Sequence, residues 1–181
     1  FIDFAGSTVV HGVGAWCALA AILVLGPRLG RFAPDGAPRS IPGHNLSLVT
    51  LGAFILWVGW FGFNAGSTLK VDVSLGLIAL NTHLAAAAGA LGAVLALRSS
   101  SSPILLTSTV NGALGGLVGI TAGCATMAPA FALLTGLVAG FLVIYGMRLM
   151  DALRLDDVVG AVPVHGFAGV WGTLAAGLFY S

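Results

Sequence analysis

Charged side chains are scarce in this sequence. Only 7% of its 181 residues are charged and 58% are hydrophobic, whereas about a quarter of an ordinary soluble domain is charged. Apolar runs such as 46–63 and 130–147 approach the ~20 residues that span the hydrocarbon core of a bilayer. The net charge of +1 provides no basic surface for nucleic acid. The composition therefore predicts a membrane protein and excludes a nucleic-acid-binding one.

Cysteine is rare, and the chain has no methionine at its start. Cys17 and Cys124 both lie in apolar surroundings, so neither a disulfide framework nor a cysteine-based metal site is indicated. The first residues, FIDFAG, also lack the basic region that opens a signal peptide. We therefore expect the chain to be a segment of a longer protein.

Six apolar segments, each bounded by Pro, Gly or charge, predict six membrane helices. Six of the seven basic residues lie in the first, third and fifth of the connecting loops. Because cytoplasmic loops carry the excess of Lys and Arg, we expect these three loops inside the cell and the first helix to run inward. The predicted fold class is an all-α, polytopic helical bundle in the cell membrane. The segments cover about 3–26, 46–67, 73–97, 104–124, 129–149 and 159–180, and the inner loops are 27–45, 98–103 and 148–158.

One pattern occurs near both ends of the chain. DFAGSTVVHG at 3–12 and DVVGAVPVHG at 157–166 both read D-x-x-G-x-x-x-V-H-G. In each copy ~12 Å of helix separates Asp from His, so His11 and His165 approach the midplane of a ~30 Å core from opposite sides. Oppositely directed copies are typical of inverted-topology repeats, which place substrate sites near the midplane. If each repeat has five helices, four precede residue 1.

The paired histidines allow three interpretations. An ionisable side chain inside a membrane is costly and suggests a functional site. His11 and His165 either ligate haem or a metal between helices, exchange hydrogen bonds and protons with a small substrate in a narrow lumen, or have only a structural role. Other ligand types are absent from the mid-helix positions, which argues against a multi-ligand metal cluster. We expect His44 in a loop or at a helix start, and His83 as a packed or interfacial side chain.

The second apolar segment contributes an aromatic face. Trp60, Phe63 and Ser67 follow the i, i+3, i+7 spacing of one helical face. An aromatic stripe usually belongs to a packed core. Aromatic rings beside a hydroxyl also suit a small cation, so these residues predict a path that leads from a cation-attracting vestibule to the histidine pair.

Motifs in all six segments resemble the ammonium transporter family, the Amt, Mep and Rh proteins. The matching stretches are DFAGSTVVH, WFGFNAGS, NTHLAAAAGA, NGALGGLVGITAGC followed by MAP, and DDVVGAVPVHGFAGVWGTLAAGLF. The resemblance implies eleven membrane helices in an inverted five-plus-five repeat, and a homotrimer with one pore per subunit. Residues 1–181 would then be helices five to ten of a single transporter domain. A regulatory partner of the PII type is expected, and no enzymatic activity, cofactor or metal.

The resemblance also implies roles for individual residues. By motif position, His11 and His165 resemble the twin-histidine pair of the family, and Phe63 resembles one ring of its phenylalanine gate. Trp60 and Ser67 resemble the outer recruitment site and its surroundings.

The acidic residues of the repeated pattern also have counterparts in the family. Asp3 resembles the aspartate near the outer site, which holds the structure and field of that site. Many family members have Asp five residues before the second histidine, where this chain has Gly160. We therefore expect Asp156 and Asp157 to cap the inner helix start.

The function implied by this resemblance is ammonium transport. Burying an isolated charge in an apolar lumen costs tens of kcal/mol, so NH4+ would be recruited outside, deprotonated, and carried past the histidines as NH3. The alternatives are an ammonium sensor fused to a signalling module and, from another class, a bis-histidine haem membrane protein.

Overall fold

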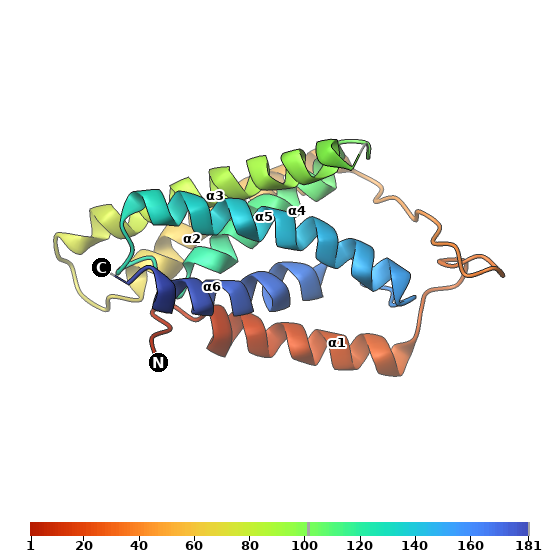
Figure 1. Ribbon diagram of the computed structural model, residues 1–181, viewed down its shortest axis with the longest axis horizontal. Coiled ribbons are helices and arrows are strands. Elements are labelled where there is room, and N and C mark those ends of the chain that lie inside the picture. The colour runs from red at the N-terminus through yellow and green to blue at the C-terminus, as the bar shows by residue number, and fades with distance from the viewer. Residues whose placement is uncertain (101, 181) are drawn as a thin grey trace.

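The computed structural model describes residues 1–100 and 102–180, which form a bundle of helices (Figure 1). In this part of the chain only two isolated β-bridges occur and there is no strand. The predicted all-α fold class is therefore confirmed. The elements are two π-helical turns, η1 (Ser7–Gly12) and η2 (Val162–Phe167), and six α-helices, α1 (Val13–Leu25), α2 (Leu46–Gly66), α3 (Ser74–Ser99), α4 (Leu106–Ile120), α5 (Pro129–Ala152) and α6 (Ala168–Leu178).

Each predicted apolar segment corresponds to one of these helical spans, although α3 continues to Ser99 and α5 to Ala152, past the predicted ends at 97 and 149. Four are long and apolar enough to cross a membrane, and two are shorter. The sequence predicts helix up to residue 124 in the fourth segment, but α4 ends at Ile120. The reason is that the Ala122 N–H donates to Ser7 Oγ, 2.8 Å away, instead of to a carbonyl of its own helix. The long spans are Ser7–Leu25, Leu46–Gly66, Ser74–Ser99 and Pro129–Ala152; the short ones are Leu106–Ile120 and Val162–Leu178.

Glycine holds the centre of the bundle together. Gly89 on α3 faces Gly116 on α4 so closely that a Cβ on Gly89 would lie 2.9 Å from Gly116 Cα. Gly92, one turn further along α3, approaches Gly140 on α5 in the same way, at 3.3 Å from Cβ to Cα. Small residues let membrane helices come together backbone to backbone. Close packing of α3 against α4 and α5 therefore depends on positions that accept no side chain.

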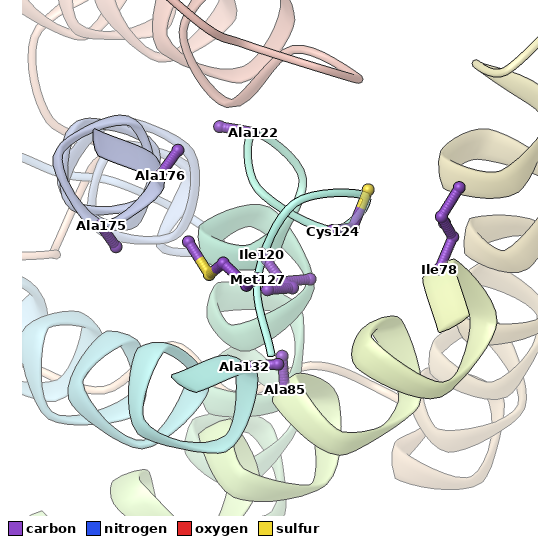
Figure 2. Packing of buried hydrophobic residues seen from close by; sticks show 9 residues of the cluster. All are labelled: Ile78, Ala85, Ile120, Ala122, Cys124, Met127, Ala132, Ala175 and Ala176. Atoms are coloured by element: carbon purple, nitrogen blue, oxygen red, sulfur yellow. The ribbon is translucent and has the colours of Figure 1, made fainter. Parts of the chain in front are cut away.

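A buried apolar cluster joins α3, α4, α5 and α6 near the turn between α4 and α5 (Figure 2). Asn81 on α3 fixes this turn, because its Nδ2 donates to the carbonyls of Cys124 and Met127 at 2.9 and 2.8 Å. The turn is thereby held against the cluster. Its members are Ile78, Ala85, Ile120, Ala122, Cys124, Met127, Ala132, Ala175 and Ala176.

The two ends of the bundle differ in charge. The chain termini, the loop between α2 and α3 and the turn between α4 and α5 share one end in Figure 1, and the other three connections share the opposite end. The opposite end therefore holds Arg28, Arg31, Arg39, Arg98, Arg148 and Arg154, whereas Lys70 lies in the α2–α3 loop. Helices α1 and α6 run in opposite directions, which agrees with the inverted repeat.

Replacing Gly89 by Ala tests the glycine contact. The added methyl group overlaps the α4 backbone, and overpacking of this kind costs about 1–3 kcal/mol, so the melting temperature of the full-length protein in detergent should fall by several degrees. Gly76→Ala is the matched control, because Gly76 lies on the same helix with no atom within 4 Å of its added Cβ. A melting temperature lowered equally in both variants would contradict this account.

Candidate functional site

The two copies of the repeated pattern fold in the same way. Each begins with an Asp, turns at a Gly with a left-handed backbone, and continues into a six-residue π-helix. The φ angles are 108° at Gly6 and 78° at Gly160, a region that glycine enters without steric cost. In both copies the histidine lies within the π-helix. Single π-helical turns are rare and occur frequently at functional sites.

A carboxylate caps each π-helix. Asp3 Oδ2 accepts the N–H groups of Thr8 and Val9 at 3.0 and 2.9 Å. The first N–H groups of a helix have no partner within the helix and favour a negative charge nearby. Asp3 therefore acts on the fold of η1, and it contacts neither histidine.

Asp157 has the equivalent role in the inner copy. Its Oδ1 accepts the N–H groups of Gly160 and Ala161 at 3.0 and 2.8 Å, and its Oδ2 accepts that of Val162 at 2.8 Å. Asp156, expected to act as a second cap, instead binds Arg28 and Arg31 of the α1–α2 loop. Its side chain turns away from the helix start because two guanidinium groups neutralise it there.

The histidines of the two copies contact each other, although they lie near opposite ends of the chain. His11 Nδ1 and His165 Nδ1 are 3.2 Å apart, within hydrogen-bonding distance. Their ring centroids are 5.2 Å apart and the ring planes differ by 22°. His11 is 9% exposed. Because one Nδ1 must donate and the other accept, the two rings carry complementary tautomers.

The distance between the two Nδ1 atoms is too short for a metal ion bound between them. Metal–imidazole bonds are about 2.0–2.1 Å long, so an ion between the two nitrogens would need them about 4 Å apart. The observed 3.2 Å suits a direct hydrogen bond. Within residues 1–100 and 102–180, no group of three or more His, Cys, Asp or Glu side chains is placed to hold a metal ion.

Two aromatic rings of α2 cover the His11 side of the pair. Trp60 stacks on His11 with 5.1 Å between ring centroids, and Phe63 lies at 5.6 Å in a tilted arrangement. Trp60 is 7% exposed and Phe63 is 39% exposed. The Trp60 Nε1–H donates to Thr121 Oγ1 at 3.1 Å, and this bond fixes the indole over the imidazole. Four of the six predicted site residues therefore form one contiguous group.

Ser67 and Asp3 do not belong to this group. Ser67 lies one turn beyond Phe63, and its hydroxyl donates to the Phe63 carbonyl at 2.8 Å. Asp3 caps η1, while its Oδ1 is buried without a hydrogen-bond partner in the described part of the chain. Ser67 directly follows α2 and Asp3 precedes η1, so both belong to the end of the bundle that carries the chain termini.

Small polar residues that sequence reasoning missed connect the site to its surroundings. Ser7 Oγ donates to the Val118 carbonyl at 2.7 Å and accepts the Ala122 N–H. The Thr8 and Thr173 hydroxyls bond to each other, which joins η1 to α6. The sequence did contain a signal for these contacts. Ser and Thr occur inside otherwise apolar segments, and a buried hydroxyl group needs a hydrogen-bond partner.

The other two histidines lie outside the site. His83 is an exposed side chain on α3 beside Trp57 and Phe61 of α2, with centroids 5.5 and 6.4 Å away. This position agrees with the packed or interfacial role expected of it. His44 is exposed in the loop before α2, directly before the Asn45 that caps this helix.

The protein is similar to known ammonium transporters over its whole length. Residues 1–181 match the model of the Ammonium Transporter Family. Ammonium transporter Amt2 of Archaeoglobus fulgidus is 52% identical over 179 residues, which are 98% of this chain and 38% of that protein. Ammonium transporter Amt2 of Methanocaldococcus jannaschii is 46% identical over 176 residues, 97% of this chain and 40% of that protein.

Solved structures show the same arrangement of helices. A structure titled Sensor Amt Protein has a TM-score of 0.96 and 44% identity, and covers all of this chain and 45% of its own. Candida albicans Mep2 has a TM-score of 0.88 and 31% identity, with 99% and 40% covered. The chain thus spans about two fifths of the length of these relatives. Its sequence and its fold agree, and the chain belongs to the ammonium transporter family.

Proposed function

We propose that the protein carries ammonium across a membrane, as ammonia, through a pore in which His11 and His165 lie side by side. The observation that carries the proposal is the hydrogen-bonded imidazole pair covered by the Trp60 ring. The names of the relatives, which are ammonium transporters, support the choice of substrate.

The imidazole pair suits a guest that both donates and accepts hydrogen bonds. When one Nδ1–H donates to the other Nδ1, the Nε2 of the donor ring is an acceptor and the Nε2 of the other ring carries a proton. His11 Nε2 is buried and has no hydrogen-bond partner among the described residues. Ammonia offers N–H donors and one lone pair, so it complements both rings. A proton can also pass along the two imidazoles, since each ring has one nitrogen that accepts a proton and one that donates a proton.

The order of residues along the path supports deprotonation before passage. In this proposal NH4+ is recruited near Ser67, where the Phe63 and Trp60 rings offer cation–π attraction of about 0.5–2 kcal/mol. The ion then loses a proton, because an isolated charge in the apolar lumen costs tens of kcal/mol. NH3 passes the histidines and the proton travels separately. K+ is excluded because it has no proton to give up.

The orientation and assembly of the pore are proposed from the charge of the loops and from the resemblance to the family. The arginine-rich end of the bundle faces the cytoplasm, since positive loops stay inside, and Asp3 then marks the outer mouth. The membrane is the cell membrane. The resemblance to the family adds four helices before residue 1, a homotrimer with one pore per subunit, and a cytoplasmic partner of the PII type.

A sensor is the second candidate function. The structure titled Sensor Amt Protein, at 44% identity and a TM-score of 0.96, favours it. A sensor would bind ammonium at the same group of residues and conduct none. Flux and binding measured on the same liposome preparation separate the two functions: saturable binding without flux identifies the sensor, and flux identifies the transporter.

Removing either imidazole should abolish the pathway. We expect His11→Ala and His165→Ala each to lower ammonium or methylammonium flux at least about tenfold in liposomes that contain the full-length protein, because each leaves the other ring without its partner. His83→Ala, which lies outside the site, should keep the flux of the unmodified protein. Unchanged flux in both single variants of the pair would refute the pore assignment.

The indole of Trp60 provides a second test. Trp60→Leu removes the ring that stacks on His11, and loss of cation–π attraction of about 1.4 kcal/mol corresponds to a tenfold lower flux at subsaturating substrate. Trp60→Phe keeps an aromatic face but loses the bond to Thr121, so it should retain most of the flux. Equal flux in the Leu and Phe variants would show that the aromatic face has no role.

A further inference from the structure

The two copies of the repeated pattern are attached to the bundle by different interactions. The outer copy is tied to the end of α4 by backbone bonds: the Phe4 N–H donates to the Ala122 carbonyl at 2.9 Å and the Ala5 N–H to the Thr121 carbonyl at 3.0 Å. Ser7 adds its two bonds to the same turn. These contacts hold η1 without any ion pair.

Among the polar contacts of the inner copy, the charged ones predominate. Asp156, which directly precedes the cap Asp157, is 5% exposed. Its Oδ2 accepts the backbone N–H and the Nε–H of Arg28 at 2.9 and 2.7 Å, and its Oδ1 accepts an Nη2–H of the same residue at 2.9 Å. One neutral bond joins the same region to α4, from Asn111 Nδ2 to the Val159 carbonyl at 2.9 Å.

Arg31 extends the ion pair into a network. Its Nε–H donates to Asp156 Oδ1 at 3.2 Å, and it also pairs with Asp151 at the end of α5. Only 13% of the Arg31 side chain is exposed, compared with 38% for Arg28. Charge-assisted bonds with a forked guanidinium are among the strongest side-chain contacts. The α1–α2 loop is thus bound to Asp151, near the end of α5, and to Asp156, shortly before η2.

Asp156, the buried carboxylate of this network, stays ionised at physiological pH. The Arg28 guanidinium lowers the pKa of the Asp156 carboxyl to about 2. Because the pKa is depressed in the folded protein, the stabilisation is present above the ordinary pKa near 4 and is lost only as the pH falls toward 2. Physiological changes of pH therefore leave the Arg28–Asp156 ion pair intact.

We propose that Arg28 and Asp156 are positioning residues through which the α1–α2 loop holds η2, and with it His165, against His11. Asp156 and Asp157 are consecutive, with Cα atoms about 3.8 Å apart, so a backbone movement at Asp156 also displaces Asp157. Asp157 in turn accepts three N–H groups at the start of η2. The loop consequently controls the inner histidine and leaves the outer one, on η1, unaffected. The link to transport rests on the proposed function; the mechanical link from loop to η2 does not.

Amide hydrogen exchange tests the mechanical link directly, because the two copies report separately. Exchange is measured on the unmodified full-length protein and on four variants of it. These are Arg28→Gln, Asp156→Asn, the double variant that combines both changes, and the control Arg39→Gln. Arg39 lies in the same loop, and its side chain forms no ion pair with described residues. All variants with one arginine replaced lose the same charge.

We expect both single variants to accelerate exchange at least about tenfold in peptides covering 157–166 and to leave peptides covering 3–12 unchanged. The double variant should exchange no faster than the faster single one, because both changes break one contact. Arg39→Gln should match the unmodified protein in both regions. If Asp156→Asn does not fold, Arg28→Gln alone decides. Unchanged exchange at 157–166, or equal acceleration in both regions, would overturn the proposal.

Flux measured on the same variants tests the link to transport. Arg28→Gln should lower ammonium flux at least about threefold, and Arg28→Lys, which restores a positive charge, should recover part of it. A faster-exchanging η2 with unchanged flux would overturn the claim that the loop controls the pore. If the unmodified protein has no flux, the proposed function fails, and the exchange experiment still decides whether the loop holds η2.

Discussion

The structure of the site depends on two carboxylates that each accept the N–H groups of a π-helical turn. In an apolar environment every backbone N–H needs a partner inside the protein, and the first N–H groups of a helical turn have no acceptor within the turn. Asp3 and Asp157 supply the missing acceptors. Each cap fixes the direction in which its π-helix leaves the turn, and thereby aims His11 and His165 at each other.

The sequence predicted where the helices and the paired histidines lie, but it did not predict the local contacts that hold the histidines in place. The apolar segments located all six helical spans, and the repeated pattern predicted that His11 and His165 approach each other near the midplane. The π-helical turns were not predicted, because a π-helix differs from an α-helix by a single shifted hydrogen bond that tertiary contacts select. The roles assigned to Trp60 and Phe63 rested on helical spacing alone, and their rings do lie against His11.

Contacts between distant loops escaped prediction for a different reason. Asp156 and Asp157 are both acidic residues before a helix, and local rules assign both to capping. Only the position of the α1–α2 loop, 128 residues away in the chain, separates their roles. The early end of α4 has the same origin, since Ser7 captures the Ala122 N–H from outside that helix. An internal repeat can thus preserve a site while its two halves are supported by unlike interactions.

The proposed transport of ammonium would place two conflicting demands on such a site. A lumen that excludes water makes an unpaired charge too costly, and a lumen without polar groups cannot distinguish ammonia from other small molecules. Two neutral imidazoles meet both demands, because together they provide one acceptor and one donor while remaining uncharged. The aromatic rings of Trp60 and Phe63 lie against the His11 side of this pair.

The distance between the two imidazoles is the most direct test of this account. Solid-state NMR on the full-length protein, with histidines labelled at Nδ1 with 15N and assigned by single His→Gln variants, measures the dipolar coupling between His11 and His165. The account predicts a coupling that corresponds to about the 3.2 Å separation of the two Nδ1 atoms. Absence of any coupling between them in the folded, membrane-embedded protein would contradict it.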